Sequence, residues 1–228
     1  MQEKTAVVIC SGGMDSTTLL YDVLSQGYKV HVISFDYNQK HRIELSKVAQ
    51  TCGKFGLVHK VLDISVLNEV APSALTRESI SVPEGHYADD NMKLTVVPNR
   101  NMVMLSLAAA YAISIKADKL YYGAHSGDHT IYPDCRPEFV EAMVQAIKLG
   151  DWHRVILEAP YSALDKGDIA IRGKELNVDY SLTWTCYNPQ ATDTEVLACG
   201  KCGACTERLE AFQKAEMADP IKYCNINN

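Results

Sequence analysis

Short apolar runs rich in β-branched residues alternate with stretches of helical periodicity along most of the chain. The apolar runs predict strands at residues 4–10, 28–35, 57–64, 118–124 and 154–160. The periodic stretches predict helices at residues 15–27, 39–55, 102–115, 137–150 and 165–178. Strands that alternate with helices form an open parallel sheet with helices on its faces, so the predicted fold class is α/β.

Two segments interrupt this alternation. Residues 68–95 contain prolines and a glycine and have no regular period, which predicts a long loop that acts as a functional lid or a mobile segment. From about Tyr180 the pattern changes again and predicts a separate small lobe. We therefore divide the chain into a main domain at residues 1–180 and a C-terminal lobe at residues 181–228.

Composition narrows the classes of function. The 228 residues are 47% hydrophobic, which is enough for a sizeable core. A formal net charge of -6 argues against a broad nucleic-acid surface, which normally needs a basic face. The sequence has no apolar run of membrane-spanning length and no secretory signal pattern. We expect a cytoplasmic protein with small-molecule partners, without membrane contact and without direct nucleic-acid binding.

The stretch "VVICSGGMDSTTLL" joins a predicted strand to a predicted helix through small polar residues. Backbone N–H groups and the positive end of a helix dipole meet there and form an anion site. Gly12 and Gly13 allow close approach of an anion, while Ser11, Ser16 and Thr17 offer hydroxyl donors. A tight turn without a ligand is the alternative. The Walker lysine and the third glycine of the dinucleotide fingerprint are both absent.

The absent lysine favours phosphate chemistry away from the γ-phosphate. The letters "SGGMDS" resemble the signature of the ATP pyrophosphatase or PP-loop family, which has an adenine nucleotide alpha hydrolase-like fold. The resemblance implies that ATP is cleaved between its α- and β-phosphates and that AMP is placed on a substrate oxygen. The nucleotide-binding residues that it implies are Cys10, Ser11, Gly12, Gly13, Met14, Asp15, Ser16, Thr17, Thr18, Leu19 and Leu20.

Four cysteines gather near the C-terminus, and their spacing is that of a tetrahedral zinc site. These predicted metal ligands are Cys186, Cys199, Cys202 and Cys205. An iron–sulfur cluster is the rival, but the expected chemistry needs no electron transfer. Four protein ligands leave no open position, so the predicted zinc is structural. Of the other cysteines, Cys10 and Cys52 are predicted to be small buried apolar residues. The role of Cys135 stays open, and Cys224 is an unpaired spare.

The stretch "YYGAHSGDHTIYPDCRPEF" follows the fourth predicted strand and is rich enough in polar residues to predict a binding loop. With the glycine turn, "YPDCR", "FDYNQKHRIE", "LNEVAPSALTRESI", "VPNRN" and the cysteines, the chain resembles the 7-cyano-7-deazaguanine synthase family over nearly its whole length. The resemblance implies a homodimer that makes a nitrile from 7-carboxy-7-deazaguanine, ammonia and ATP. The acid and then the amide would be adenylated, with Mg²⁺ on the nucleotide.

Bringing a carboxylate and phosphates together requires converging cations or N–H donors. The candidate catalytic residues are Asp15, Arg100, Asp134, Arg136 and Lys166. Asp15 has two interpretations, a helix cap or a group that orients Mg²⁺ on the phosphates. His41 and Arg42 stand where the family also has a basic pair, although a surface role is favoured for Arg42.

The chain departs from the family pattern at Asn99, where glycine is usual, and at residues 129–131, where an aromatic-Ser-Gly run is usual. We expect both departures to lie in the substrate pocket. Asn99 tolerates a positive φ, so that change is conservative, whereas His129 and Ile131 alter polarity and volume. The alternatives are therefore an enzyme that stops at the amide, a tRNA-thiolating PP-loop enzyme, and a non-catalytic nucleotide-binding module fastened by zinc.

Overall fold

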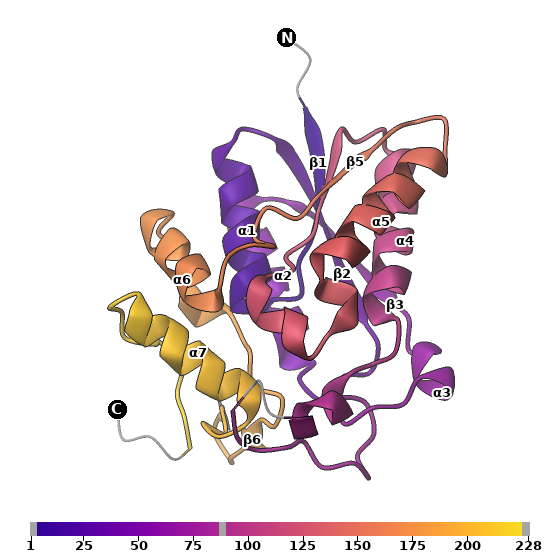
Figure 1. Ribbon diagram of the computed structural model, residues 1–228. Coiled ribbons are helices and arrows are strands. Elements are labelled where there is room, and N and C mark those ends of the chain that lie inside the picture. The colour runs from indigo at the N-terminus through magenta and orange to yellow at the C-terminus, as the bar shows by residue number, and fades with distance from the viewer. Residues whose placement is uncertain (1–3, 87–89, 225–228) are drawn as a thin grey trace.

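The centre of the protein is a five-stranded parallel sheet in the order β3-β2-β1-β4-β5 (Figure 1). The computed structural model describes residues 4–86 and 90–224, so part of the predicted loop lies outside the described residues. The strands are β1 Thr5–Ile9, β2 Lys29–Asp36, β3 Val58–Asp63, β4 Lys119–Tyr121 and β5 Ile156–Glu158. The five predicted strands and the predicted α/β class are confirmed.

The burial of each strand explains its sequence pattern. In the central strand β1, Ala6, Val7 and Val8 are all fully buried, because helices cover both faces of the sheet. In the edge strand β3, by contrast, Val58 and Val61 are about half exposed. Continuous apolar runs therefore mark the central strands, whereas the edge strand tolerates polar neighbours.

The predicted helices are also confirmed, with small shifts at their ends. Their bounds are α1 Met14–Ser25, α2 Ile43–Phe55, α4 Arg100–Ser114, α5 Pro137–Leu149 and α6 Lys166–Glu175. Helices α1, α2 and α6 pack on one face of the sheet, and α4 and α5 pack on the other (Figure 1). Asp165 caps α6 as predicted, since its carboxylate accepts a hydrogen bond from the Asp168 N–H at 2.9 Å.

The strand order fixes where a ligand can bind. The chain runs outward from β1 to β2 and β3, then crosses back to β4 on the other side of β1. Ligands of open α/β sheets bind beyond the carboxyl ends of the strands at such a reversal. The glycine turn follows β1, and the polar stretch that begins at Tyr121 follows β4. Both therefore lie at the expected crevice.

The described part of the predicted loop at residues 68–95 is anchored at one place, and its role as a functional lid or a mobile segment stays a prediction. It contains the end of the short helix α3, Leu67–Val70, and a 3-10 helix, Asp90–Thr95. Ala74 and Leu75 are fully buried, and the Leu75 carbonyl accepts a hydrogen bond from the Lys40 N–H at 2.8 Å. Local sequence missed this anchoring because the buried residues are spaced without a period.

The C-terminal tail packs along the main part of the protein. It contains the short strands β6 Gln190–Ala191 and β7 Val196–Leu197 and the helix α7 Gly203–Lys214, which lies beside α6 (Figure 1). Phe212 of α7 shares an apolar cluster with Met14 of α1 and Ala170 of α6. The domain boundary at residues 180 and 181 stays a prediction, but the tail buries its apolar side chains against the main part of the chain.

A buried ion pair fastens this tail internally. Arg208 of α7 is fully buried, and its guanidinium donates two hydrogen bonds to Asp219 at 2.7 and 2.9 Å. It also donates to the hydroxyl groups of Thr183 and Thr185. Such a bidentate pair satisfies most donors of a buried guanidinium, so the segment before the cysteines is held against α7.

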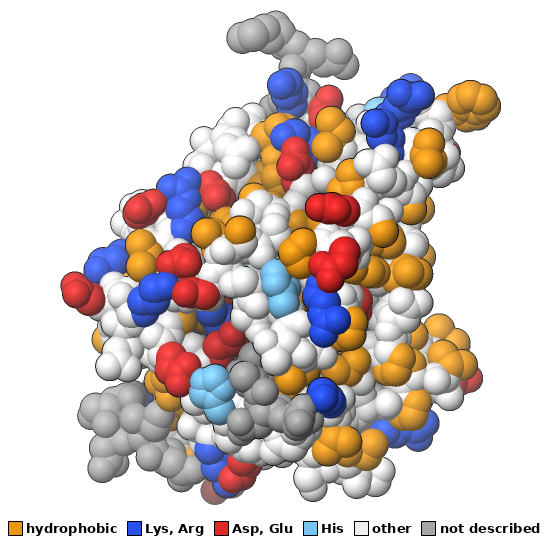
Figure 2. Space-filling model, in the orientation of Figure 1, with side chains coloured by type: hydrophobic (Ala, Val, Ile, Leu, Met, Phe, Trp, Pro, Cys, Tyr) orange, Lys and Arg blue, Asp and Glu red, His pale blue; other side chains and the backbone are white. Residues whose placement is uncertain are grey.

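The surface agrees with this arrangement. Figure 2 shows charged side chains of both signs gathered over α6 and α7, whereas hydrophobic side chains are more frequent over the side that carries α3 and α4. Met102 and Leu107 of α4 are among the exposed apolar residues.

Of the helices in the described part of the chain, none combines the length and the apolar character needed to cross a membrane.

Candidate functional site

The glycine turn lies between the end of β1 and the start of α1. Gly12 has φ 98°, and a Cβ built on it would lie 2.1 Å from the Glu44 carbonyl oxygen of α2. Only glycine fits there. We predicted that Gly12 gives room to an anion, whereas the structure adds a packing reason, the close approach of the α2 backbone. Ser11 Oγ accepts a hydrogen bond from the Gly13 N–H at 3.1 Å and holds the turn in shape.

The first turn of α1 is open to an anion. No side chain caps this helix, and its N-cap residue is Gly13. Asp15 in particular does not cap it, because its carboxylate faces Lys166 and His125 instead. The first N–H groups of α1 therefore have no side-chain cap, and the turn has the geometry expected of an anion site, which stays a prediction.

A cavity opens at this turn. Among the predicted nucleotide-binding residues, those that line it are Cys10, Ser11, Gly13, Asp15 and Ser16. The others serve packing: Leu19 and Leu20 lie in the core below the sheet, and Thr18 hydrogen-bonds to Tyr180 of the tail. The tail also contributes to the cavity wall, through Trp184, Thr185 and Tyr187. The site is therefore built from both ends of the sequence.

One group of ionisable residues, which we call the Lys166 cluster, lies beside the turn. It consists of Asp15, His125, Asp128, Lys166 and Glu207. Lys166 Nζ lies 3.5 Å from Asp15 Oδ2 and 2.5 Å from Glu207 Oε2. Burial alone would lower the pKa of Lys166, but Asp15 and Glu207 raise it above its usual range. The lysine therefore stays charged although it is almost completely buried.

A second group of residues, the Glu44 cluster, contributes Tyr37, His41, Glu44 and Arg100 to the lining of the cavity. It consists of Tyr37, Gln39, His41, Glu44 and Arg100. Burial raises the pKa of Glu44 to about 8 and lowers the pKa of His41 to about 3. Both side chains are therefore neutral at pH 7. Arg100 donates a hydrogen bond to Tyr37 Oη at 3.0 Å and supplies the cation of this group.

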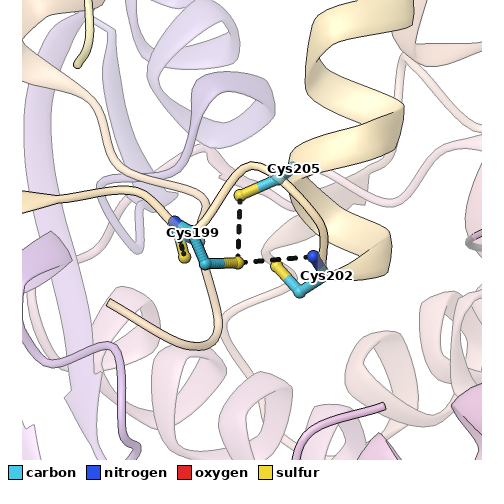
Figure 3. A group of neighbouring side chains, drawn as sticks. Cys199, Cys202 and Cys205 are labelled. Carbon is cyan, nitrogen blue, oxygen red and sulfur yellow. Dashed lines mark hydrogen bonds between the residues drawn. The ribbon is translucent and has the colours of Figure 1, made fainter. Parts of the chain in front are cut away.

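The four cysteines of the tail form a compact group, of which Figure 3 labels Cys199, Cys202 and Cys205. Their sulfur atoms all lie within 4.8 Å of one another, and all four residues are buried. Cys199 Sγ and Cys205 Sγ are 3.9 Å apart, close to the roughly 3.8 Å between sulfurs around a tetrahedral zinc with Zn–S bonds of about 2.3 Å. The Cys199 and Cys202 N–H groups donate to sulfur atoms of the group at 3.2 and 3.3 Å. These contacts fit thiolates that bind a metal ion.

The predicted catalytic residues divide into two sets. Asp15, Arg100 and Lys166 line the cavity, whereas Asp134 and Arg136 do not. Asp134 Oδ2 accepts a hydrogen bond from the Asn101 N–H at 2.9 Å and so holds the first turn of α4. Arg136 Nε donates to the His129 carbonyl oxygen at 2.9 Å. Asp134 and Arg136 thus shape the walls, and their direct roles stay predictions.

The basic pair after β2 also divides. His41 is buried and lines the cavity, while the Arg42 side chain is 58% exposed and pairs with Asp36 on the surface. The favoured surface role of Arg42 agrees with this placement.

The scattered cysteines can also be placed. Cys10 and Cys52 are buried, as predicted, and lie in the same apolar cluster. Cys135, whose role the sequence left open, is buried at the cavity wall and accepts a hydrogen bond from Asn101 Nδ2. Cys224 is exposed.

The expectation that the departures lie in the substrate pocket stays a prediction, but the cavity at the glycine turn gives it no support. Neither His129 nor Ile131 lines the cavity. Ile131 is 4% exposed and belongs to the main apolar core. Asn99 has φ 59° at the N-cap of α4, a left-handed conformation that asparagine tolerates, so the conservative interpretation of that change agrees with the backbone.

Sequence reasoning missed several residues of the cavity and its surroundings. Glu44 was hidden inside a predicted helix, and Glu207 follows the cysteines in a segment that was assigned only to metal binding. His125 and Asp128 lie in the predicted binding loop but were not singled out as a pair. A signal for Glu44 existed: it stands within the quoted stretch "FDYNQKHRIE", directly after the second strand.

The fold and the site together define an α/β protein with a cavity at a glycine turn and a tail in which four buried cysteines lie close enough together to hold a metal ion. The family model described as "Queuosine biosynthesis protein QueC" matches residues 5–216. The chain therefore belongs to the QueC family, which the sequence resemblance had predicted.

Named relatives agree with this family. The chain is 59% identical to a 7-cyano-7-deazaguanine synthase of Methanoregula boonei, covering 96% of this chain and 98% of the relative. It is 61% identical to a protein of that name from Caldicellulosiruptor saccharolyticus, covering 96% and 95%. An NH3-dependent NAD synthetase from Campylobacter jejuni matches with a TM-score of 0.47 and 16% identity, covering 80% of this chain and 68% of that one.

Proposed function

We propose that this chain is an ATP-dependent ligase that converts 7-carboxy-7-deazaguanine and ammonia into 7-cyano-7-deazaguanine. The observation that carries the proposal is the full-length similarity to synthases of that name, in a chain whose uncapped glycine turn opens into a cavity. The reaction belongs to queuosine biosynthesis, as the family description says. We expect ATP to be cleaved to AMP and pyrophosphate.

The proposed reaction has two adenylations. A carboxylate oxygen of the substrate attacks the α-phosphorus of ATP, the bond to the β-phosphate oxygen breaks, and pyrophosphate leaves. Ammonia then attacks the carbonyl carbon, and AMP leaves with the former carboxylate oxygen, which gives the amide after proton loss. The amide oxygen attacks the α-phosphorus of a second ATP and releases a second pyrophosphate, and loss of both N–H protons and of AMP then forms the C≡N bond.

The charges of the cavity suit these steps. The phosphates would bind at the first turn of α1, near Lys166, and the lysine would offset the negative charge that develops when pyrophosphate leaves. The flat heterocycle would lie toward the Glu44 cluster, where Tyr37 and Tyr187 offer aromatic surface and Arg100 offers a cation for the carboxylate. Keeping Glu44 neutral avoids repulsion of that substrate carboxylate.

Asp15 fits a role with Mg²⁺ better than a role as a cap. Its Oδ1 atom is buried without a hydrogen-bond partner in the described structure, although the side chain stands beside the anion turn. A carboxylate oxygen is the kind of ligand that Mg²⁺ takes together with phosphates. Mg²⁺ would neutralise phosphate charge, while Asp15 would orient the nucleotide on the turn.

We propose that the four-cysteine site holds one structural zinc ion. Cys186, Cys199, Cys202 and Cys205 supply a complete tetrahedral set with fitting sulfur separations. The ion would tie the segment that carries Trp184 and Tyr187 to α7, and so hold one wall of the cavity. We further propose a cytoplasmic homodimer with small-molecule substrates and without direct nucleic-acid binding.

The nucleotide product tests this proposal. Protein incubated with Mg²⁺, ATP and 7-carboxy-7-deazaguanine should release pyrophosphate and, once ammonium chloride is added, AMP. Omission of the acid should abolish both. Formation of ADP and phosphate instead would overturn the assignment. An absence of any acid-dependent nucleotide product would favour a non-catalytic binding module.

The lining of the cavity does not support the amide-forming alternative. It rested on His129 and Ile131 as pocket residues, and neither lines the cavity. Nothing else among the described residues favours a stop at the amide.

A further inference from the structure

Gln39 is a buried polar residue of the Glu44 cluster, in the segment between β2 and α2. It is 1% exposed, and it does not line the cavity in the described structure. A side-chain amide carries two N–H donors and an acceptor oxygen, and buried groups of this kind need partners. The partners of this amide therefore show what the residue holds.

The amide of Gln39 joins three groups. Its Oε1 atom accepts a hydrogen bond from the Tyr37 N–H at 3.0 Å. Its Nε2 atom donates to the Phe35 carbonyl oxygen and to Glu44 Oε1, both at 3.3 Å. A backbone N–H can only donate and a backbone carbonyl can only accept, so the two backbone contacts fix which end of the amide carries the nitrogen.

The three partners of this amide all line the cavity. Phe35 lies near the end of β2 and Tyr37 directly follows that strand, whereas Glu44 lies in the first turn of α2. One buried side chain therefore ties the end of a strand to the start of a helix, directly beside the cavity. A residue that only filled space there would need no such set of polar contacts.

Tyr37 in turn contacts Arg100, the first residue of α4. Arg100 Nη1 donates a hydrogen bond to Tyr37 Oη at 3.0 Å, and the guanidinium carbon lies 5.4 Å from the centre of the Tyr37 ring. Both residues line the cavity. Since these contacts orient the guanidinium, a shift of Tyr37 would move the cation with it.

We propose that Gln39 is a positioning residue for the acid substrate: it holds Tyr37 and Glu44 in place and, through Tyr37, the guanidinium of Arg100. The inference rests on the proposed function, since that function assigns Arg100 to the carboxylate of the heterocycle. The phosphates of ATP bind at the first turn of α1, to which the amide of Gln39 makes no hydrogen bond in the described structure. Loss of the amide therefore weakens binding of the acid more than binding of ATP.

Gln39→Leu tests this role by removing the amide at a similar side-chain volume. Exchange of pyrophosphate into ATP, measured without ammonium, reports the first adenylation alone. The KM for 7-carboxy-7-deazaguanine should rise about tenfold or more, which corresponds to roughly 1.4 kcal/mol, while the KM for ATP should change less than about threefold. Gln50→Leu is the matched control, because Gln50 lies on α2 and is exposed, and both KM values should stay at the wild-type level.

Gln39→Glu is a second variant in case Gln39→Leu does not fold. Its carboxylate keeps an acceptor for the Tyr37 N–H but has no donor for the Phe35 carbonyl oxygen or for Glu44. The KM for the acid should therefore rise again, and the KM for ATP should change less. Thermal unfolding identifies the folded variants, and the KM values of these are compared.

A double variant tests the path through Tyr37. Tyr37→Phe removes the hydroxyl group that contacts Arg100, so Gln39→Leu should raise the KM for the acid by a smaller factor in Tyr37→Phe than in the wild type. Wild-type protein without acid-dependent pyrophosphate exchange would contradict the proposed function itself. With exchange intact, the positioning role would be overturned by a wild-type KM for the acid in both Gln39 variants, by an equal rise of both KM values, or by an undiminished effect of Gln39→Leu in Tyr37→Phe.

Discussion

The Lys166 cluster and the Glu44 cluster both contribute side chains to the lining of the cavity, but their central residues differ in charge. Lys166 is charged, whereas Glu44 is neutral at pH 7. In the first, carboxylates surround a buried lysine and keep it charged. In the second, burial raises the pKa of Glu44 to about 8, even though Arg100 acts in the other direction. The deciding factor is the charge of the partners in contact: Lys166 has two carboxylates, whereas Glu44 Oε1 has the neutral Gln39 amide at 3.3 Å.

The difference in charge suggests that the two clusters suit different parts of the proposed substrates. A site for phosphates, Mg²⁺ and a leaving pyrophosphate needs fixed charges, because reorganising charge during the reaction is costly. A site for a flat heterocycle that carries a carboxylate needs neutral polar groups and a single cation. The changes predicted below affect the Lys166 cluster, the Glu44 cluster, or the C-terminal tail that contacts both.

Loss of the metal should have the largest effect, because the tail contributes to both clusters' surroundings through Glu207 and Tyr187. Structural zinc contributes on the order of 10 kcal/mol in small domains, comparable to the stability of a whole protein. Chelation or Cys199→Ser should therefore unfold the tail and abolish AMP formation. Circular dichroism, metal analysis and the AMP assay measure the three consequences.

Cys224→Ser is the control for this experiment, since Cys224 is exposed and outside the four-cysteine group. It should retain metal, Tm and activity. An iron–sulfur absorption band would replace the zinc assignment, and a Cys199→Ser protein with wild-type Tm would refute the structural role.

Lys166→Gln should remove the charge that offsets the leaving pyrophosphate. We expect the rate of AMP formation to fall roughly 10²- to 10³-fold, as for the loss of other preorganised electrostatic groups. Lys174→Gln is the control, because Lys174 lies on the same helix and is exposed. Stopped-flow or steady-state AMP assays compare the two. Equal rates in both variants would remove Lys166 from the mechanism.

Glu44→Gln should change the pH dependence of the free energy of unfolding. We expect this effect to be smaller than those of metal loss and of Lys166→Gln. The pKa of Glu44 is raised from 4.5 to about 8, so its contribution is full below pH 4.5 and is lost as the pH rises to 8. The pKa of His41 is lowered from 6.5 to about 3, so its contribution is lost as the pH falls through that range. Of these two groups, only Glu44 therefore changes its contribution between pH 6.5 and 8.

Urea unfolding between pH 6.5 and 8 measures this effect. Wild-type stability should fall with rising pH by at most about 1.4 kcal/mol per pH unit, and Glu44→Gln should flatten that slope. Glu141→Gln, at an exposed position of α5, should keep the wild-type slope. A wild-type slope in Glu44→Gln would mean that Glu44 is ionised in the folded protein.

The sequence was sufficient to predict elements whose signal is local. The strands, the helices of the main part, the Asp165 cap and the four-cysteine group all rest on periodicity, turn residues or spacing over a few positions. Helix α7 was missed, because its buried face is built largely from Ala204, Ala211 and the aliphatic part of Arg208 rather than from a stripe of large apolar residues.

Features that depend on long-range contact were beyond local patterns. The pKa of Glu44 depends on burial by segments far away in the sequence, and the requirement for glycine at position 12 arises from the backbone of α2. In the same way, Glu207 reaches Lys166 only because α7 packs along α6. His129 and Ile131 do not line the cavity, because membership of a polar loop does not decide which side chains face one.

The mass of the product from 7-carboxy-7-deazaguanine, ammonium and Mg²⁺–ATP tests the central claim most directly. If the cavity carries out both adenylations, the product has the mass of the nitrile, and AMP forms in a two-to-one ratio to it. Accumulation of the amide with equimolar AMP, or an unchanged acid, would contradict the claim.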